Sequence, residues 1–341
     1  MLSIEDKKRA MEISPAVAED RPAIIELLRL SLGESTIPKS EALWSWKHEQ
    51  NPFGQSYVLI AEENNQLIGV RAFMQWQWEW RGRLYRSIRA VDTATHPEHQ
   101  GKGIFSRLTR QQLERCRNDG IDFVFNTPNS QSMPGYLKMG WVKLGKMPLK
   151  VKLLRPLSIA GASLFRKKES IFETDLTPVQ KWTHDIFNLA TNYVRHTKRI
   201  TTSLSPQYIS WRYGNNPLYR YYYFTDQQHY LLISRIKDHV IGRELRLVDF
   251  VLINDKASHR QVRREMKQAV LRFCREHNVS FIACSGRQYH LQRKWLGWMG
   301  SLPIVNRGPM VTLRDLNMED AFDELRKLRH WGFSLGDMEL F

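Results

Sequence analysis

The sequence predicts an α/β (α+β) protein built from two tandem domains of one fold, each with a mixed, mostly antiparallel sheet flanked by helices. Segments with helical and with strand periodicity alternate along the 341 residues, a length that suits two domains. Segments of the first half recur in the same order in the second half, which indicates a repeated fold. Hydrophobic residues make up 42% of the chain and aromatic residues 11%, enough to fill packed cores.

The first half is predicted to contain two helices followed by three strands: 20–32, 40–49, 56–62, 67–80 and 84–95. Asp20 is the expected N-cap of the first helix. Asn64 and Asn65 form the expected turn between the first two strands. Residues 75–80 (QWQWEW) alternate strictly, so their three tryptophans share one face of a strand. We interpret that face as buried core, with a nucleic-acid stacking platform or a substrate-cleft wall as alternatives.

A glycine-rich turn follows these strands, within residues 95–108 (THPEHQGKGIFSRL). The segment is typical of a strand end, a tight turn and the start of a helix. Gly101 and Gly103 leave backbone N–H groups unshielded where the helix begins, and Lys102 adds a positive charge. Unpaired amides at the positive end of a helix dipole bind anions. The sequence therefore predicts an anion site here, with an ordinary tight turn as the alternative.

The internal repeat rests on three matches that occur in the same order. Residues 46–53 (WKHEQNPF) match residues 211–218 (WRYGNNPL) at an offset of 165 residues. Two further matches have offsets of 158 and 157 residues: 113–124 with 271–282, and Gly140-Trp141 with Gly297-Trp298. The offset falls from 165 to 158 and 157 residues along the chain. This decrease indicates that the second copy has a deletion of seven or eight residues in the hairpin region between the matched segments. Three ordered matches predict two copies of one fold.

The predicted first domain, linker and second domain occupy residues 1–160, 161–175 and 176–341. Residues 150–153 are the expected last strand of the first domain. The second domain is expected to open with a helix over residues 178–198 and to contain a strand at 243–251. Where the glycine-rich turn should recur, residues 255–261 (DKASHRQ) contain no glycine, and a Cβ at each position would block close approach of a pyrophosphate. The second domain is therefore predicted to be a degenerate copy that serves as scaffold, as a substrate wall, or as both.

Composition and charge limit the classes of function. The net charge is +16, and a basic cluster falls at Arg260, Arg263, Arg264 and Lys267. This charge suits a polyanion such as coenzyme A, a nucleotide-linked sugar, tRNA or a lipid surface, or simply a solvated helix face. The sequence contains no run of about 18 apolar residues, so no membrane span is predicted. Its N-terminal residues lack the apolar core of a signal peptide. The three cysteines lack CxxC spacing, which predicts reduced packing residues in a cytoplasmic protein and no metal site.

The flanks of the glycine-rich turn resemble the acyl-CoA motif of the GNAT superfamily, a family of acyl-coenzyme A transferases. That motif reads Gln/Arg-x-x-Gly-x-Gly/Ala, and residues 100–105 (QGKGIF) match its first four positions. Phe105 departs from the small residue at the final position. Asn129, Tyr136 and the pair Gly140-Trp141 resemble the second family signature, in which a strand-end Asn precedes a Tyr and a Gly-aromatic pair. The resemblance implies a GNAT fold in the first half.

The resemblance also implies acetyl-CoA as the acyl donor. Its pantetheine arm would pair with the backbone of Thr93, Ala94 and Thr95, where a bulge in the family splays the sheet. Its pyrophosphate would rest on the amides of Gln100, Gly101, Lys102, Gly103, Ile104 and Phe105. Asn129 matches the family residue that helps to hold the arm. A backbone N–H near Ala94 or Thr95 would stabilise the oxyanion of the transition state.

Two side chains are candidates for proton transfer. Tyr136 matches the family tyrosine that protonates the departing thiolate, with packing of its helix as the alternative. Asp92 is the carboxylate nearest the expected reaction centre and the candidate general base. The direction in which the Asp92 side chain points depends on the bulge. Ion pairing with Arg89, or binding of a cation, is the structural alternative to the role of general base.

These features favour an acetyl-CoA-dependent N-acetyltransferase that acts on a primary amine of a small molecule, such as an amino sugar. The first alternative is an aminoacyl-tRNA-dependent transferase, which the positive charge supports and the intact glycine-rich turn argues against. Nucleic acid is therefore not the favoured partner. The second alternative is a non-catalytic acyl-CoA-binding protein.

Overall fold

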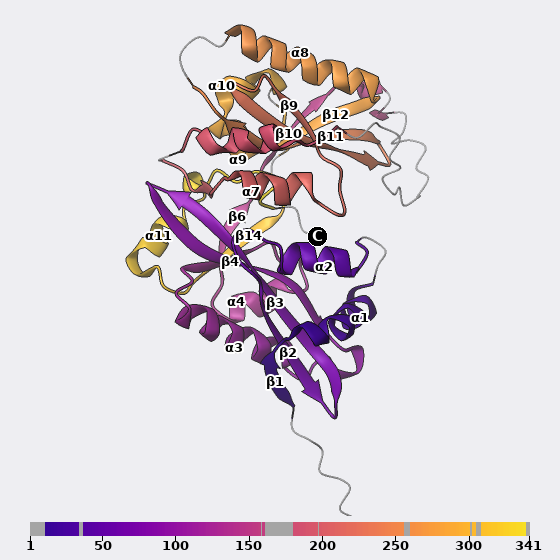
Figure 1. The fold of residues 1–341 in the computed structure, drawn as a ribbon, viewed down its shortest axis with the longest axis vertical. Coiled ribbons are helices and arrows are strands. Elements are labelled where there is room, and N and C mark those ends of the chain that lie inside the picture. Colours follow the sequence, from indigo (N-terminus) through magenta and orange to yellow (C-terminus); the bar gives the residue numbers. More distant parts are fainter. Residues whose placement is uncertain are drawn as a thin grey trace, which may run out of the picture.

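Two β-sheets form the framework of the protein, and Figure 1 shows them one above the other along the long axis. The first half of the chain, in indigo and purple, builds most of the lower part, and the orange and red segments build the upper part. The yellow segments close to the C-terminal end return to the lower part. The computed structural model describes residues 11–33, 37–157, 159–160, 180–196, 198–255, 260–300, 302–304 and 308–338.

The first sheet has eight strands in the order β1-β2-β3-β4-β5-β14-β6, with β8 paired to β3. Its β4–β5 pair is parallel, and its other pairs are antiparallel. The strands are β1 (Glu12–Pro15), β2 (Tyr57–Glu63), β3 (Gln66–Trp80), β4 (Arg83–Thr95), β5 (Phe123–Asn126), β6 (Val142–Lys146), β8 (Thr201–Thr202) and β14 (Met310–Asp315).

The second sheet has six strands in the order β13-β7-β12-β11-β10-β9, and only its β11–β12 pair is parallel. The strands are β7 (Leu149–Leu153), β9 (Tyr222–Thr225), β10 (Tyr230–His239), β11 (Gly242–Leu252), β12 (Val279–Ser285) and β13 (Leu302–Ile304). Both sheets are thus mixed and mostly antiparallel, and each is flanked by helices, which confirms the predicted fold class.

Each half of the chain contributes to the sheet of the other half: β7 of the first half joins the second sheet, and β8 and β14 of the second half join the first sheet. Strand β7 was expected to be the last strand of the first domain, but it pairs with β12 and β13 of the second sheet. Strand β14 lies between β5 and β6 of the first sheet. The expected linker at 161–175 lies outside the described residues, so the domain boundaries stay a prediction. The exchange means that neither sheet is built from one half alone.

The helices near the first sheet are α1 (Arg21–Leu32), α2 (Glu41–His48), α3 (Ile104–Asn118), α4 (Met133–Lys138) and α11 (Phe322–Leu325). Helix α1 packs with Ile60 of β2, and α3 packs with Leu59 and Ala61 of the same strand. Successive residues of a strand point to opposite faces, so these two helices cover opposite faces of the sheet. Ser40 caps α2 as a side-chain acceptor for the Leu43 amide. Asp20 does not cap α1 as predicted, because its carboxylate accepts from the Val17 amide instead.

The helices of the upper part are α6 (His184–Asn188), α7 (Pro206–Ile209), α8 (Arg260–Glu276), α9 (Gly286–Leu291) and α10 (Arg293–Leu296). Short 3-10 helices occur at Ala18–Asp20, Pro97–His99, Leu189–Asn192, Gly297–Met299, Glu319–Ala321 and Leu328–His330, and a π-helical turn at Ser210–Gly214. The helix predicted for 178–198 is wrong in extent: residues 178–179 lie outside the described part, and the helical backbone ends at Asn192. Val194 leaves the helix because its amide donates to the carbonyl of Leu252 in the second sheet.

A tryptophan-rich core fills the space between the sheets. Trp76, Trp78 and Trp80 of β3 are all buried, which confirms the interpretation of the alternating segment as a core face. Trp46 and Trp211, the residues aligned by the 165-residue offset, meet in this core with ring centroids 4.9 Å apart. Each indole N–H donates to the other residue's carbonyl oxygen at 2.7 Å. The two copies therefore pack face to face through equivalent residues.

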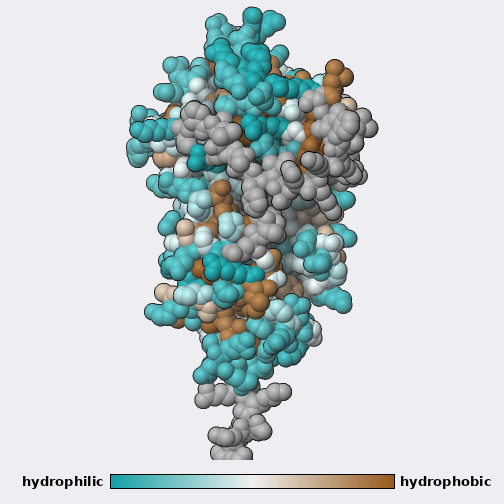
Figure 2. All heavy atoms as spheres, turned by 90° about the vertical axis from the view of Figure 1, so that its right-hand side faces the viewer, coloured by the Kyte–Doolittle hydropathy of each residue, from teal (hydrophilic) through white to brown (hydrophobic). Residues whose placement is uncertain are grey.

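Hydrophilic side chains cover both ends of the face shown in Figure 2, and apolar side chains gather between them in its lower half. Within the described ranges, no helix is both long and apolar enough to cross a membrane. The three cysteines, Cys116, Cys274 and Cys284, are buried and unpaired. Burial raises the pKa of each thiol to about 12, so these thiols are inert packing groups.

Candidate active site

The central strands of the first sheet diverge at their C-terminal ends. Strands β4 and β5 pair in parallel from Ser87 to Arg89, and the described chain forms no further pair between them. On the other side of β4, Arg71 of β3 pairs with Thr93, whereas the next residue of β3 pairs with Val91. Asp92 is thus the extra residue of a β-bulge, which bends β4 away from β5. The bulge that the family resemblance implied is present at this position.

A cleft of about 960 Å³ opens where the strands diverge, a size typical of small-ligand sites, which span roughly 300–1,000 Å³. Its walls are the end of β4, the glycine-rich turn, the segment 126–136 and the end of α1. The predicted site residues that line the cleft are Asp92, Thr93, Ala94, Thr95, Gln100, Gly101, Gly103, Ile104, Phe105, Asn129 and Tyr136. Lys102 does not line it: its side chain is exposed to solvent, and its ammonium lies 3.4 Å from His99 Nδ1.

The glycine-rich turn presents open amides at the first turn of α3. Gly101 and Gly103 have φ angles of +77° and +76°, a conformation that favours glycine. Within the described chain, the N–H groups of residues 101–105 donate to no protein acceptor. The Gln100 amide donates to the carbonyl of Pro97 at 3.4 Å, so the group of open donors begins at Gly101. Five free amides at a helix N-terminus have the chemistry of an anion site.

A glycine in β3 sets how closely α3 approaches the sheet. A Cβ on Gly69 would lie 2.7 Å from Ile104 Cγ2 and 3.1 Å from Leu108 Cδ1. Both contacts are closer than packed carbon atoms tolerate, so Gly69 is what allows the first turn of α3 to rest on the sheet. That contact places the open amides at the rim of the cleft.

Tyr136 of α4 lines the cleft and is held by a buried arginine. Arg71 Nη2 donates to the Tyr136 hydroxyl at 2.8 Å, and Arg71 Nη1 donates to Thr93 Oγ1. Arg71 was not among the predicted site residues, although it is a lone arginine in the apolar stretch 67–74 (LIGVRAFM), a pattern that could have indicated it. Phe105 packs edge-on against Tyr136 with centroids 5.6 Å apart. The departure from the small residue of the motif therefore adds a contact to Tyr136.

Asp92 is bound by two residues of α2 that the sequence analysis did not identify. Lys47 Nζ lies 2.7 Å and His48 Nε2 2.9 Å from the same carboxylate oxygen, Oδ2. Burial alone would raise the pKa of Asp92, but Lys47 and His48 outweigh it and hold that pKa well below its usual range. Arg89, the ion-pair partner in the structural alternative, donates to the carbonyls of residues 337 and 338 at 2.6 and 3.0 Å.

Burial lowers the pKa of His48, with Asp92 opposing the shift, so the imidazole is neutral near pH 7. Its Nδ1 lies 2.9 Å from Ser56 Oγ, which occupies the second ring nitrogen. Burial also lowers the pKa of Lys47, and Asp92 again opposes the shift. Among the described residues, Asp92 Oδ1 has no hydrogen-bond partner, and this is the oxygen left to meet a ligand.

Asn129 is mainly a turn-capping residue. Its Oδ1 accepts from the Gln131 amide at 3.1 Å and from the Ser132 amide at 2.8 Å, just before α4 begins. Only its NH₂ group remains to face the cleft. Asn126 at the end of β5 also lines the cleft, and its Oδ1 accepts from the hydroxyl of Thr312 on β14. The exchanged strand thus supports one wall of the cleft, which no local pattern in the sequence could show.

The equivalent place in the second sheet is filled by the chain itself. Strand β11 has a bulge at Val248, and its pairing with β12 continues to Leu247, directly beside that bulge. The amide of Gly336 donates to the Val248 carbonyl at 3.1 Å. Ser285 Oγ donates to the carbonyl of Phe333 at 2.9 Å. The segment 332–338 therefore lies across the ends of β11 and β12.

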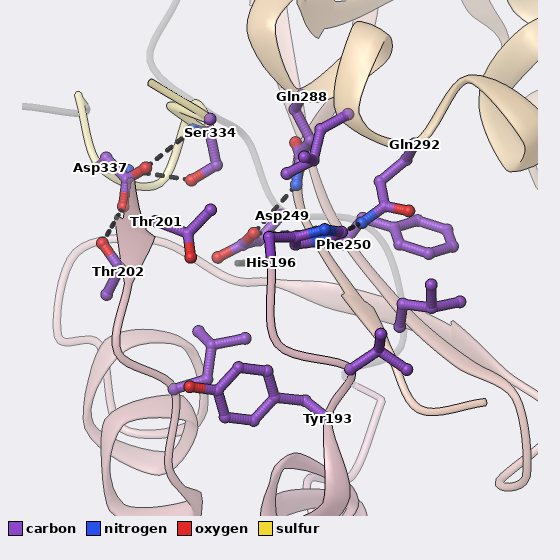
Figure 3. Close-up of a pocket in the computed structure, with 15 residues that line it drawn as sticks. Tyr193, His196, Thr201, Thr202, Asp249, Phe250, Gln288, Gln292, Ser334 and Asp337 are labelled. Atoms are coloured by element: carbon purple, nitrogen blue, oxygen red, sulfur yellow. Dashed lines mark hydrogen bonds between the residues drawn. The ribbon is translucent and has the colours of Figure 1, made fainter. Parts of the chain in front are cut away.

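A polar cavity of about 40 Å³ remains beside this segment (Figure 3). Asp249 accepts from Gln288 Nε2 at 3.0 Å (Figure 3). It also accepts from the Tyr213 hydroxyl at 2.8 Å. Asp337 accepts from Thr202 Oγ1 at 2.6 Å and from the Ser334 amide at 2.7 Å. The cavity has room for a few water molecules and not for a cofactor. No cluster of metal-binding side chains occurs in the part of the chain that the structure describes.

Sequence comparison identifies the family of the first half. A family model described as an acetyltransferase (GNAT) domain matches residues 12–143. Residues 12–143 form a GNAT domain. The L-amino acid N-acyltransferase MnaT of Escherichia coli (strain K12) is 28% identical over 94 residues, which are 27% of this chain and 53% of that protein. The chain thus spans about half the length of this relative.

Solved structures extend the likeness to both sheets. A probable N-acyltransferase from Enterococcus faecalis has a TM-score of 0.60 at 11% identity and covers 91% of this chain and 74% of its own. A GCN5-related N-acetyltransferase from Kribbella flavida has a TM-score of 0.58 at 12% identity and covers 90% of this chain and 71% of its own. At these identities the likeness shows the fold. The GNAT domain is therefore one part of a larger shared architecture.

Proposed function

We propose that the protein is an N-acetyltransferase that moves an acetyl group from acetyl-CoA to a primary amine of a small molecule, such as an amino sugar. One observation carries the proposal: the open amides of residues 101–105 and the hydroxyl-bearing Tyr136 border the same cleft. An anion site and a proton donor on one cleft are what transfer from a phosphate-bearing thioester requires.

The donor would be held at two places. The amides of residues 101–105 would bind its pyrophosphate, and the backbone of Thr93, Ala94 and Thr95, which β5 leaves free, would pair with its pantetheine arm. The Thr95 carbonyl already accepts from Ser31 Oγ at 3.1 Å, which fixes this strand end against α1. The NH₂ group of Asn129 would donate to the arm from the opposite wall.

Transfer would proceed by attack of the neutral amine on the thioester carbonyl. The C–N bond forms, the C–S bond breaks, and the thiolate takes a proton from the Tyr136 hydroxyl. A carboxylate with a lowered pKa is a weak proton acceptor, so Asp92 would position the amine through Oδ1 while water removes the proton. Lys47 and His48 would keep that carboxylate ionised and fixed.

Thermal unfolding with and without acyl-CoA tests the donor site. We expect acetyl-CoA to raise the Tm of the wild type, and Gly101→Asp or Gly103→Asp to weaken binding at least about 100-fold, because a carboxylate crowds and repels the phosphates. Gly82→Asp is the matched control. Gly82 has φ +76°, its added Cβ also meets no atom within 4 Å, and it lies in a hairpin away from the cleft.

A panel of amines, read by release of free thiol, tests the reaction. Acetylation that Tyr136→Phe slows supports the proposal. Donor binding without acetylation of any amine, and a silent Tyr136→Phe, would identify a non-catalytic acyl-CoA-binding protein. Wild-type donor affinity in both glycine variants would place the anion site elsewhere.

A further inference from the structure

Arg71 is a fully buried cation without a carboxylate partner among the described residues. Its side chain is 0% exposed. The guanidinium donates to the hydroxyls of Tyr136 and Thr93, and its Nε, also buried, has no acceptor. Its carbon Cζ lies 4.6 Å from the ring centroid of Phe73 and 5.4 Å from those of Phe105 and Tyr136. Burying a charge without a counter-ion is unfavourable, so this arrangement needs a reason.

Two further arginines that are fully buried in the described part of the chain, Arg89 and Arg212, make a different kind of contact. Arg89 and Arg212 donate to backbone carbonyls of residues 336–338, which ties that segment to the core. Arg71 donates to hydroxyl groups of two residues that line the cleft. Its contacts are therefore directed at the site and not at the chain fold.

The direction of the Arg71–Tyr136 hydrogen bond determines what the tyrosine can do. A guanidinium has donors only, so the Tyr136 oxygen accepts this bond. The hydroxyl hydrogen of Tyr136 must then point to a different acceptor. Tyr136 is 5% exposed and lines the cleft, so the cleft is the open direction for that hydrogen.

We propose that Arg71 is a positioning residue that holds Tyr136 as a proton donor toward the cleft and supplies the positive charge that stabilises its phenolate. The inference rests on the proposed acyl transfer. As the C–S bond breaks, the proton of the Tyr136 hydroxyl passes to the thiolate sulfur, and the phenolate oxygen stays beside the guanidinium. The phenolate regains a proton from water, which has taken one from the amine, so protons and charge balance.

Phe105 completes this arrangement. Its ring covers both Arg71 and Tyr136, and a Cβ on Gly135 would lie 3.2 Å from Phe105 Cε1, so glycine at 135 leaves room for the ring. Water is thereby kept from the guanidinium. In a less polar surrounding, the charge of Arg71 acts more strongly on the phenolate.

Steady-state kinetics of Arg71→Met, Arg71→Lys and Tyr136→Phe test the proposal. We expect Arg71→Met to lower kcat about 10- to 100-fold while KM for acetyl-CoA changes less than about threefold, because Arg71 does not touch the open amides. The alkaline limb of the kcat–pH profile should move to higher pH, because the phenolate loses its cation. Arg71→Lys should restore part of the rate, and Arg71→Met should add little to Tyr136→Phe.

A second measurement does not depend on acyl transfer. Coenzyme A bound to the protein is titrated, and the thiolate is followed by its ultraviolet absorbance. We expect the bound thiol to ionise at higher pH in Arg71→Met and in Tyr136→Phe than in the wild type. If no amine is acetylated but this shift is present, the proposed function fails, and only the positioning of Tyr136 toward the thiol by Arg71 stands.

Arg212→Met is the matched control, because Arg212 is also buried and donates to the carbonyl of Gly336, and neither residue lines the cleft. It should lower stability without moving the pH profile or the thiol titration. Additive losses in the double variant, or an unchanged pH profile and thiol titration in Arg71→Met, would make Arg71 a structural residue only. If Arg71→Met does not fold, Arg71→Lys decides between the same outcomes with the same two readouts.

Discussion

The two sheets share a bulged central strand, yet among the described residues a cleft opens at the bulge of the first sheet and not at that of the second. In the first sheet, pairing between β4 and β5 stops at Arg89, three residues before the bulge at Asp92. In the second sheet, pairing reaches Leu247, directly beside the bulge at Val248. The segment 332–338 then covers the strand ends. The difference shows that the bulge alone does not make a site: the neighbouring strand must also part, and nothing from the chain must fill the gap.

A carboxylate lies at each bulge, with partners from equivalent positions. His48 and Tyr213, aligned at an offset of 165, bind Asp92 at 2.9 Å and Asp249 at 2.8 Å respectively. Asp92 also has the ammonium of Lys47 at 2.7 Å and stays ionised. Burial, and then the nearby Asp337, raises the pKa of Asp249 to about 7. Equivalent positions thus hold an ionised carboxylate, Asp92, at the cleft of the first sheet and a carboxyl group that can be protonated, Asp249, in the second sheet.

The largest expected effect is on the contact that joins the copies. Trp46→Ala and Trp211→Ala should each lower the free energy of unfolding by about 3–5 kcal/mol, because each removes a buried indole and the hydrogen bond that it donates to the other residue's carbonyl. Equal losses, measured by denaturant unfolding, would support equivalent roles for the two residues. A silent change at either one would break the comparison.

A double-mutant cycle sharpens this result. Trp46→Phe and Trp211→Phe together should cost less than the sum of the single changes, since the two indole rings stack on each other and each single change already disturbs that shared contact. Trp141→Phe is the control, because Trp141 packs on Tyr136 and not on the pair. Its loss should add to that of Trp211→Phe.

A smaller effect on stability is expected at Asp92, the residue of the bulge beside the cleft. Asp92→Asn should destabilise the protein by about 3 kcal/mol at pH 7, because it removes the carboxylate charge that lies 2.7 Å from the buried ammonium of Lys47. A carboxylate with a lowered pKa contributes stability above its usual pKa and loses it as the pH falls. The difference between wild type and variant should therefore shrink in acid. A constant difference from pH 7 to pH 3 would contradict the ion pair.

Much of the framework followed from the sequence because local patterns encode it. Alternation at 75–80 predicted the buried tryptophan face, and the 165-residue offset aligned Trp46 with Trp211, which the structure brings into contact. Glycines at 101 and 103 predicted the turn, because positive φ angles restrict the residue type. All but Lys102 of the predicted site residues reach one cleft.

The features that the sequence could not show are contacts between distant segments. Arg71 meets Tyr136 across 65 residues, and Lys47 meets Asp92 across 45. Neither pair has a fixed spacing, so no periodicity predicts it. The exchange of β7 and β14 has the same cause: a strand pattern gives a strand and its two faces but not the strand beside it.

The smallest expected effect is at the closed bulge, and its sign is opposite. Because the pKa of Asp249 is raised in the fold, its contribution to stability is complete below about pH 4 and is lost as the pH rises to about 7. Asp249→Asn keeps the shape of the side chain and removes its charge. The stability of this variant relative to the wild type should therefore rise by on the order of 2 kcal/mol from pH 5 to pH 8. Urea unfolding at both pH values measures this change. A relative loss at pH 8, as at Asp92, would mean that Asp249 is ionised beside an unseen cation and that the two bulges are alike in charge.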